Sequence, residues 1–358
     1  MPLPPLPWRR IALAAAATLG GLLALTSAFL LWASSGFDDT DPLHVRPERY
    51  GGPAAERPPA APPARLRVIA WNIAYGRGRP DDAGDLRSAD TIRANLAGIA
   101  RVLRELHPDV VALQEVDFDS ARTHGIDQLA WLAREAGYPW AARVETWTCR
   151  YVPYPYWPPS QHYGRMRSGQ AILSRFPIRS NVRRLLPQPP NPFWYNWFYI
   201  HRALQHAELD LGGGLLLDAI NVHTEAFHQR NREEHADRIA AYVRSLPPDR
   251  PRLLLGDFNA IPPEATLRRG FPDEPETDMT TDRTIATIRS LGLAEALDPA
   301  TPLPDTFTFP ADAPNRRLDY VWFSPTLRRL DGRVVREAGS LSDHLPVVVD
   351  LALEPRLR

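Results

Sequence analysis

The chain contains no lysine and only one cysteine, Cys149, in 358 residues. Its 42 basic side chains other than histidine are therefore all arginines, and they balance 42 acidic side chains to a formal net charge of zero. A neutral chain lacks the overall basic surface that usually accompanies sequence-independent DNA binding, although a local basic stripe remains compatible with it. A single cysteine excludes an internal disulfide, so cysteine usage does not identify the redox compartment.

Long hydrophobic runs are also absent, except for an uncharged apolar run at residues 11–32, directly after Arg9 and Arg10. A helix of about 22 residues is about 33 Å long, enough to cross a hydrocarbon core about 30 Å thick. With arginines before the run and Asp38 after it, the positive-inside rule predicts a cytoplasmic N-terminus and an extracytoplasmic body. A cleaved signal peptide, with small residues at 33–35, is the alternative and would give a secreted protein. We favour a retained single-pass membrane anchor because the run exceeds an ordinary signal core.

Proline and glycine are concentrated between residues 41 and 64. This composition is typical of a semi-extended stalk that packs no core. We therefore predict five segments: an N-terminal segment at 1–10, a transmembrane anchor at 11–32, a Pro-rich linker at 33–64, a catalytic domain at 65–353 and a C-terminal tail at 354–358.

Polar side chains end several strand-like runs in the body. The most informative is Gly256-Asp257-Phe258-Asn259, which puts a carboxylate and an amide two residues apart directly after the run Arg252-Leu253-Leu254-Leu255. Other runs end in Asn72, Glu115 and His223, and near the C-terminus residues 317–321 carry Asp319 and residues 342–347 carry the pair Asp343-His344. Each buried polar group costs about 1 to 3 kcal/mol when it has no partner, so a core that merely folds has no use for so many. We therefore expect them to converge on one site.

Apolar periodicity predicts a strand, helix, strand opening, followed by partly antiparallel strands and further helices. The expected helices lie at 91–106, 126–136, 228–246 and 284–291. Because both halves of the body mix strands and helices, the pattern is compatible with two sheets packed face to face with helices outside.

Seven motifs resemble, in sequence order, those of the endonuclease/exonuclease/phosphatase superfamily, which includes DNase I-like nucleases and neutral sphingomyelinases. The motifs are Asn72, Gln114-Glu115, residues 168–175, residues 221–224, Gly256-Asp257-Phe258-Asn259, residues 317–320 and Ser342-Asp343-His344. The resemblance covers roughly residues 65–353. It implies an α/β fold, a four-layer α/β/β/α sandwich of two mixed sheets flanked by helices, here preceded by one transmembrane helix. It also implies metal-dependent hydrolysis of a phosphoester.

The resemblance implies a metal site built from oxygen ligands. Glu115 would be the principal ligand of Mg²⁺, with Asn72 beside it and Asp343 close to the metal. Mg²⁺ prefers few carboxylates and several waters, which suits this set, and Mn²⁺ is the alternative ion. A zinc site would require more histidine or thiolate than the motifs supply.

The same resemblance implies catalytic roles for five residues. Asp319 and His344 match a carboxylate–imidazole pair in which the acid stabilises the imidazolium. Asp257 would orient or deprotonate the attacking water, and Asn259 would donate to a phosphate oxygen. His223 would stabilise developing charge or assist the leaving group. The division of the base role between Asp257 and His344 stays open, as does the number of metal ions.

Aromatic residues crowd two segments, 140–163 and 193–199. They either pack long loops against the body or form a lip that enters the bilayer interface, where Trp and Tyr are favoured. Together with the anchor, they favour a phospholipid or sphingomyelin-like headgroup as substrate. An exported nuclease whose aromatics stack on unpaired bases is the alternative, and Arg143, Arg150, Arg165 and Arg167 suit either substrate. A third hypothesis is a catalytically silent binding protein on the same fold.

Overall fold

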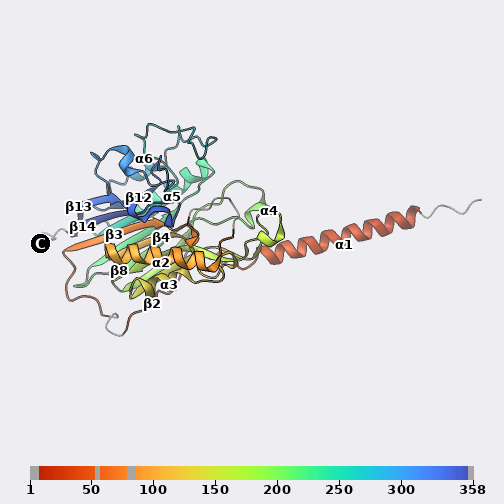
Figure 1. Ribbon diagram of the computed structural model, residues 1–358, viewed down its shortest axis with the longest axis horizontal. Coiled ribbons are helices and arrows are strands. Elements are labelled where there is room, and N and C mark those ends of the chain that lie inside the picture. The colour runs from red at the N-terminus through yellow and green to blue at the C-terminus, as the bar shows by residue number, and fades with distance from the viewer. Residues whose placement is uncertain (1–7, 53–56, 79–85, 354–358) are drawn as a thin grey trace, which may run out of the picture.

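The computed structural model describes residues 8–52, 57–78 and 86–353, and its body contains two seven-stranded mixed sheets (Figure 1). One sheet has the order β1 (Leu43–His44), β7 (Ile178–Leu185), β8 (Ala203–Asp210), β9 (Leu216–His223), β10 (Arg252–Asp257), β12 (Asp319–Phe323) and β11 (Ala294–Glu295). The other has the order β13 (Leu327–Val334), β14 (Val347–Leu353), β3 (Arg65–Asn72), β4 (Val110–Asp117), β6 (Gly164–Ser174), β5 (Trp140–Val152) and β2 (Glu48–Arg49). The pairs β9/β10 and β3/β4 are parallel.

Helices cover the outer face of each sheet. The helices α2 (Ala89–Leu106) and α3 (Gln128–Glu135) pack on the sheet that contains β3, and α5 (Gln229–Ser245) and α6 (Thr284–Arg289) pack on the other. They correspond to the four predicted helices. Shorter elements lie in the connections: α4 (Phe193–Asn196) and 3₁₀ turns at Ala74–Gly76, Ala121–Thr123, Pro159–Gln161, Leu303–Thr306 and Arg336–Leu341.

Three apolar layers hold this arrangement together, and strand alternation explains them. In β3, Leu66, Val68 and Ala70 point into a core shared with the opposite sheet. Ile69 and Trp71, which alternate with them, point into a second core under α2 and α3. A third core lies between the other sheet and α5 and α6. The predicted four-layer α/β/β/α sandwich is therefore confirmed.

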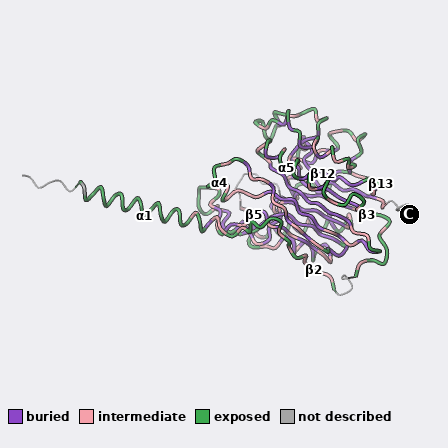
Figure 2. The backbone as a smooth tube through the Cα atoms, turned by 180° about the vertical axis from the view of Figure 1, so that it is seen from behind, coloured by how far each residue is buried: buried purple, intermediate pink, exposed green. Residues whose placement is uncertain are grey.

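The N-terminal helix α1 (Trp8–Ser34) projects away from the sandwich, and its residues are exposed along most of its length (Figure 2). Its segment Arg10–Ser34 is long and apolar enough to cross a membrane, and a signal sequence would have the same character. The C-terminal end of α1, from Phe29 onward, contacts the body. There Ala33 is fully buried, and the rings of Phe29 and Tyr151 lie 6.0 Å apart.

The first part of the predicted Pro-rich linker is not a stalk, which corrects the expectation for that segment. The strand β1 pairs with β7 and β2 pairs with β5, so each adds a short edge strand to one of the two sheets. The ring of Phe37 stacks on His201 at 3.9 Å. Composition missed this docking because short edge strands tolerate neighbouring prolines. Residues 53–56 of the linker lie outside the described part of the chain. The body therefore follows α1 without a free spacer.

Candidate active site

Predicted site residues meet at one end of the sandwich because they continue the strand faces that point between the sheets. In β10, Leu253 and Leu255 belong to the inter-sheet core, and Asp257 is the next residue on that face. The same alternation brings three further residues to this end of the inter-sheet space: Asn72 in β3, His223 in β9 and Asp319 in β12.

Glu115 reaches the site by a different route. By alternation after Val111 and Leu113 it would face α2 and α3, since both of these residues lie in the core beneath those helices. Instead, Glu115 has a φ of 55°, and the register of β4 against β6 shifts between Leu113 and Val116. A left-handed conformation costs a non-glycine residue about 1 to 3 kcal/mol, and such strain and bulges gather at functional sites, where they re-aim a side chain.

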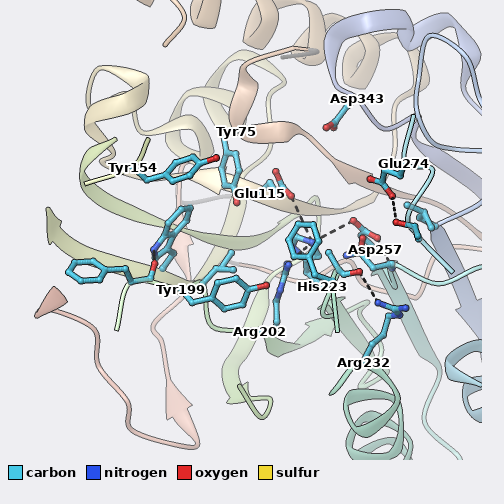
Figure 3. A pocket seen from close by; sticks show the side chains of 18 of the residues that line it. Tyr75, Glu115, Tyr154, Tyr199, Arg202, His223, Arg232, Asp257, Glu274 and Asp343 are labelled. Carbon is cyan, nitrogen blue, oxygen red and sulfur yellow. Dashed lines mark hydrogen bonds and ion pairs between the residues drawn. The ribbon is translucent and has the colours of Figure 1, made fainter. Parts of the chain in front are cut away.

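A cavity of about 1360 Å³ opens at this end of the molecule (Figure 3). Six of the eight predicted site residues line it: Glu115, His223, Asp257, Asn259, Asp343 and His344. Asn72 supports two of them, because its amide nitrogen donates to Asp257 at 3.0 Å and to Glu115 at 3.3 Å. The amide oxygen of Asn72 accepts the N–H of Ala74 at 3.0 Å. In this arrangement Asn72 orients the two carboxylates and caps the following turn.

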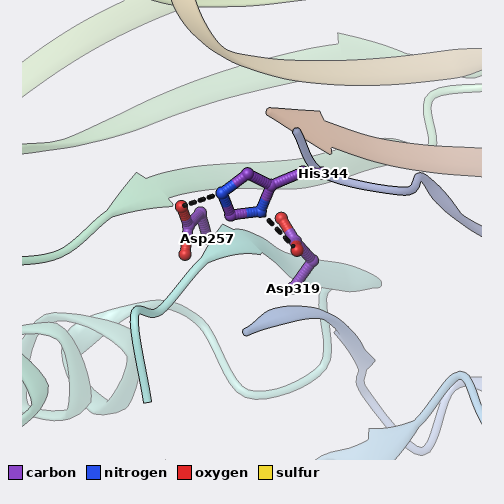
Figure 4. A group of neighbouring side chains, drawn as sticks. All are labelled: Asp257, Asp319 and His344. Carbon is purple, nitrogen blue, oxygen red and sulfur yellow. Dashed lines mark hydrogen bonds and ion pairs between the residues drawn. The ribbon is translucent and has the colours of Figure 1, made fainter. Parts of the chain in front are cut away.

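His344 lies between two buried carboxylates (Figure 4). Its Nδ1 is 2.8 Å from an Asp319 oxygen, and its Nε2 is 3.7 Å from Asp257. Burial alone would lower the pKa of His344, but the charges of Asp319 and Asp257 outweigh it and hold this pKa well above its ordinary value. The ring is therefore an imidazolium at neutral pH, with Nδ1–H donated to Asp319 and Nε2–H on the side of Asp257.

His223 has the opposite charge state. Burial, together with the positive charge of Arg202, lowers the pKa of His223 well below its ordinary value. Arg202 Nη1 lies 2.7 Å from His223 Nε2, and because a guanidinium only donates, this nitrogen accepts. Neutral His223 therefore brings no charge of its own, and the fixed cation beside it is Arg202.

Arg202 is the main site residue that the sequence prediction left out. Its side chain is 6% exposed and lies 3.7 Å from Glu225, which in turn accepts a hydrogen bond from Tyr199 at 2.7 Å. The sequence feature that could have identified Arg202 is its position directly before a strand expected to border the cleft. Its role as the fixed cation beside His223 depends on contacts with residues more than twenty positions away, which periodicity does not reveal.

Two groups of carboxylates in the site have the chemistry of a cation site. Asp257, Asp319 and His344 bring three ligand-type atoms within 4.8 Å of one another. The protonated imidazole of His344 offsets one of the two carboxylate charges in that group. Glu115 and Asp343, which both line the cavity, form the second group, and burial together with the charge of Asp343 raises the pKa of Glu115 to about 7. Oxygen ligands of this kind suit Mg²⁺, and Glu115 with Asp343 fits it better than the histidine-containing group.

Buried amides tie the two sheets together beneath the site. Gln114 Nε2 donates to the Asn221 side chain at 2.7 Å, and the Asn221 amide donates to Gln205 at 3.2 Å. Gln170, in the motif expected to be scaffold, donates to the Asn221 carbonyl at 3.1 Å. These hydrogen bonds between the sheets fix the relative position of the strands that carry the site.

Three of the four arginines that suit either substrate are engaged with carboxylates of the body. Arg143 pairs with Asp127 at 2.9 Å, Arg165 with Asp119 at 2.5 Å and Arg167 with Glu145 at 3.0 Å. Their charge is therefore largely neutralised within the body.

Comparisons with known proteins agree with this geometry. Among solved structures, an endonuclease/exonuclease/phosphatase from Beutenbergia cavernae DSM 12333 is 24% identical with a TM-score of 0.56, covering 81% of this chain and 72% of its own. A mannosyl-6-phosphatase from Bacteroides thetaiotaomicron VPI-5482 is 18% identical with a TM-score of 0.53, covering 80% and 100%. A humanized TDP2 from D. rerio is 16% identical with a TM-score of 0.52, covering 81% and 99%. At these identities the likeness concerns the fold.

No curated protein sequence matches the chain significantly. The model of the Endonuclease/Exonuclease/phosphatase family, however, matches residues 69–344, a range that includes all eight predicted site residues. The chain therefore belongs to the endonuclease/exonuclease/phosphatase family, whose members are hydrolases that act on phosphoesters.

Proposed function

We propose that the protein is a divalent-metal-dependent phosphodiesterase that cleaves the headgroup phosphodiester of a phospholipid or sphingomyelin-like lipid at the outer face of a membrane. The observation that carries this proposal is the composition of the cavity. One end is lined by Glu115, Asp257 and His344, and the same cavity is lined elsewhere by aromatic side chains and by Leu30 of α1. A polar reactive end and an apolar outer part suit an amphiphilic phosphoester.

In the proposed mechanism, Glu115 and Asp343 would hold Mg²⁺, which supplies neutralisation of the phosphate oxygens. The Asp257 carboxylate, held by Asn72 and by the N–H of Asn259 at 2.8 Å, accepts a proton from the attacking water. Its pKa is raised by burial, which makes it a better proton acceptor. Protonated His344 donates its Nε2 proton to the leaving oxygen. In this proposal Asp257 is the base because it is a carboxylate, and His344 is the acid because it is protonated.

Two observations favour a lipid over a nucleic acid. The arginines at 143, 165 and 167 are paired with carboxylates, so they do not form a free basic track for a polyanion. In addition, Glu276 and Asp278 line the cavity, whereas Glu274, which lies on its far side from Tyr154 (Figure 3), is paired with Arg316 at 3.0 Å. An acidic wall repels a nucleic-acid backbone but accepts a headgroup that carries a cation.

The proposal is tested with the full chain in detergent or in vesicles. We expect release of phosphocholine from sphingomyelin or phosphatidylcholine liposomes in the presence of Mg²⁺, loss of that activity with a chelator, and recovery when Mg²⁺ is restored. Nicking of plasmid DNA is measured in parallel. Activity on DNA alone would eliminate the lipid substrate, and turnover that survives complete chelation would eliminate the metal.

Replacing Arg202 by alanine should lower kcat/KM by about 100-fold, the usual effect of removing one donor aimed at developing negative charge. Because the charge of Arg202 also depresses the pKa of His223, that pKa should rise in the variant, which NMR of the histidine ring measures. Arg202→Lys keeps the charge but not the planar fork, so its loss should be intermediate. The control is Arg165→Ala, an exposed arginine outside the cavity lining. Equal rates for wild type and Arg202→Ala would show that Arg202 does not stabilise the negative charge that develops during the reaction.

A further inference from the structure

Exposed aromatic side chains surround the mouth of the cavity. Outside α1, the described part of the chain exposes ten large apolar side chains, and eight of them lie in three segments near this mouth. We call five of the eight the aromatic rim: Tyr156, Trp157, Phe193, Trp194 and Phe227. Trp157 is 80% exposed and Phe227 79%. Tyr156, Trp194 and Phe227 also line the cavity, which joins the rim to the site. Apolar side chains gathered in this way mark a surface that meets a partner.

The position of α1 identifies the partner. Leu30 of α1 lines the same cavity, and the Phe29 ring contacts Tyr151 at 6.0 Å in the strand that leads into the rim. The 25 residues from Arg10 to Ser34 form a helix about 37 Å long, against a hydrocarbon core of about 30 Å. With α1 in a bilayer, its last turns therefore reach the interface where the rim lies.

The attachment of α1 to the body keeps the mouth of the cavity at the membrane interface. The residues after α1 do not form a spacer, since Phe37 stacks on His201 and β1 and β2 join the edges of both sheets. Figure 1 shows α4, which carries Phe193 and Trp194, beside the end of α1, and the strand β13 at the opposite end of the body. The sandwich is thus held with its open end toward the membrane that α1 would cross.

We propose that the aromatic rim docks the cavity mouth into the bilayer interface, and that the outer, aromatic half of the cavity binds the backbone of a lipid that remains in the membrane. Tyr and Trp rings are favoured at this depth. Val152, Tyr154 and Phe198 line the outer half with Leu30, and the phosphoester of such a lipid reaches Glu115 and Asp257 at the inner end. The identity of the bound lipid as substrate rests on the proposed function, whereas the docking does not.

Docking is measured independently of turnover, with the full chain reconstituted in phosphatidylcholine vesicles. Cysteines introduced as Trp157→Cys and Phe193→Cys are labelled with a fluorophore, and Leu330→Cys in β13 is the control. The native Cys149 stays unlabelled because it is buried and burial raises its pKa to about 12. We expect a quencher carried on the lipids to reduce the fluorescence at 157 and 193 and to leave that at 330 unchanged. Equal quenching at the three positions, or none at 157 and 193, would overturn the proposal.

A second measurement compares two substrates. The double variant Trp157→Ala, Phe193→Ala should lose about tenfold activity on vesicle lipid, because fewer apolar groups hold the mouth at the interface. Neither residue lines the cavity, so hydrolysis of soluble bis(p-nitrophenyl) phosphate should be unchanged. Leu330→Ala should change neither activity. Equal losses on both substrates would contradict the proposal, as would protection of the labels by a single-stranded oligonucleotide instead of quenching by lipid. If the wild type hydrolyses no phosphoester, the proposed function fails while the quenching result still decides the docking.

Discussion

Replacing Glu115 by glutamine should lower kcat/KM for the phosphodiester by about 1000-fold. Glutamine keeps the size of the side chain but removes the carboxylate that, with Asp343, is our candidate metal ligand pair. Loss of about 4 kcal/mol of charge stabilisation corresponds to that factor. Since the φ of 55° at this position is equally costly for both residues, the fold should be retained. Steady-state rates at several Mg²⁺ concentrations measure the effect.

The control for this variant is Glu145→Gln, which also removes one carboxylate from the body. Glu145 pairs with Arg167 and does not line the cavity, so its loss should leave kcat/KM nearly unchanged. Binding of Mg²⁺, followed by calorimetry without substrate, should weaken only in Glu115→Gln. A Glu115→Gln variant with wild-type rates and wild-type Mg²⁺ affinity would show that the metal is held elsewhere, with the Asp257 and Asp319 group as the next candidate.

The site was largely predictable because strand alternation is local information. Asp257 and His223 end strands, Asp319 begins one, and most of the alternate residues in these strands are apolar, so the period of two puts the three side chains on the face that the sheets share. The family motifs added Glu115. Alternation alone would have turned this residue toward the helices, because the bulge in β4 that re-aims it has no clear signal in the residues around it.

Charge states and edge docking could not be predicted in the same way. Whether a buried histidine is neutral or protonated depends on which charges surround it, and Arg202 lies beside His223 whereas Asp319 lies beside His344. The strands β1 and β2 have only two residues each, too few for a periodic signal, and their partners lie far along the chain. Their docking nevertheless removes the spacer between the helix and the body.

Replacing His344 by alanine should lower kcat by about 1000-fold, because a positioned acid contributes roughly this much to proton transfer. The Asp319→Asn variant tests whether Asp319 keeps His344 protonated. Asp319 raises the pKa of His344, so removal of its charge should lower that pKa. An acid must be protonated to act, and the rate falls as the pH rises through its pKa. The alkaline limb of the rate profile should therefore move to lower pH in Asp319→Asn, with a loss of about 100-fold in kcat.

The pH profile separates this role from a structural one, since a merely unstable variant loses rate without a shift of the alkaline limb. Asp210→Asn is the matched control, because Asp210 pairs with Arg179 on the surface and should leave the profile unchanged. A limb that stays in place in Asp319→Asn, or moves to higher pH, would mean that His344 is not the acid. The base role of Asp257 would then need revision too, because the division between the two groups rests on their opposite charges.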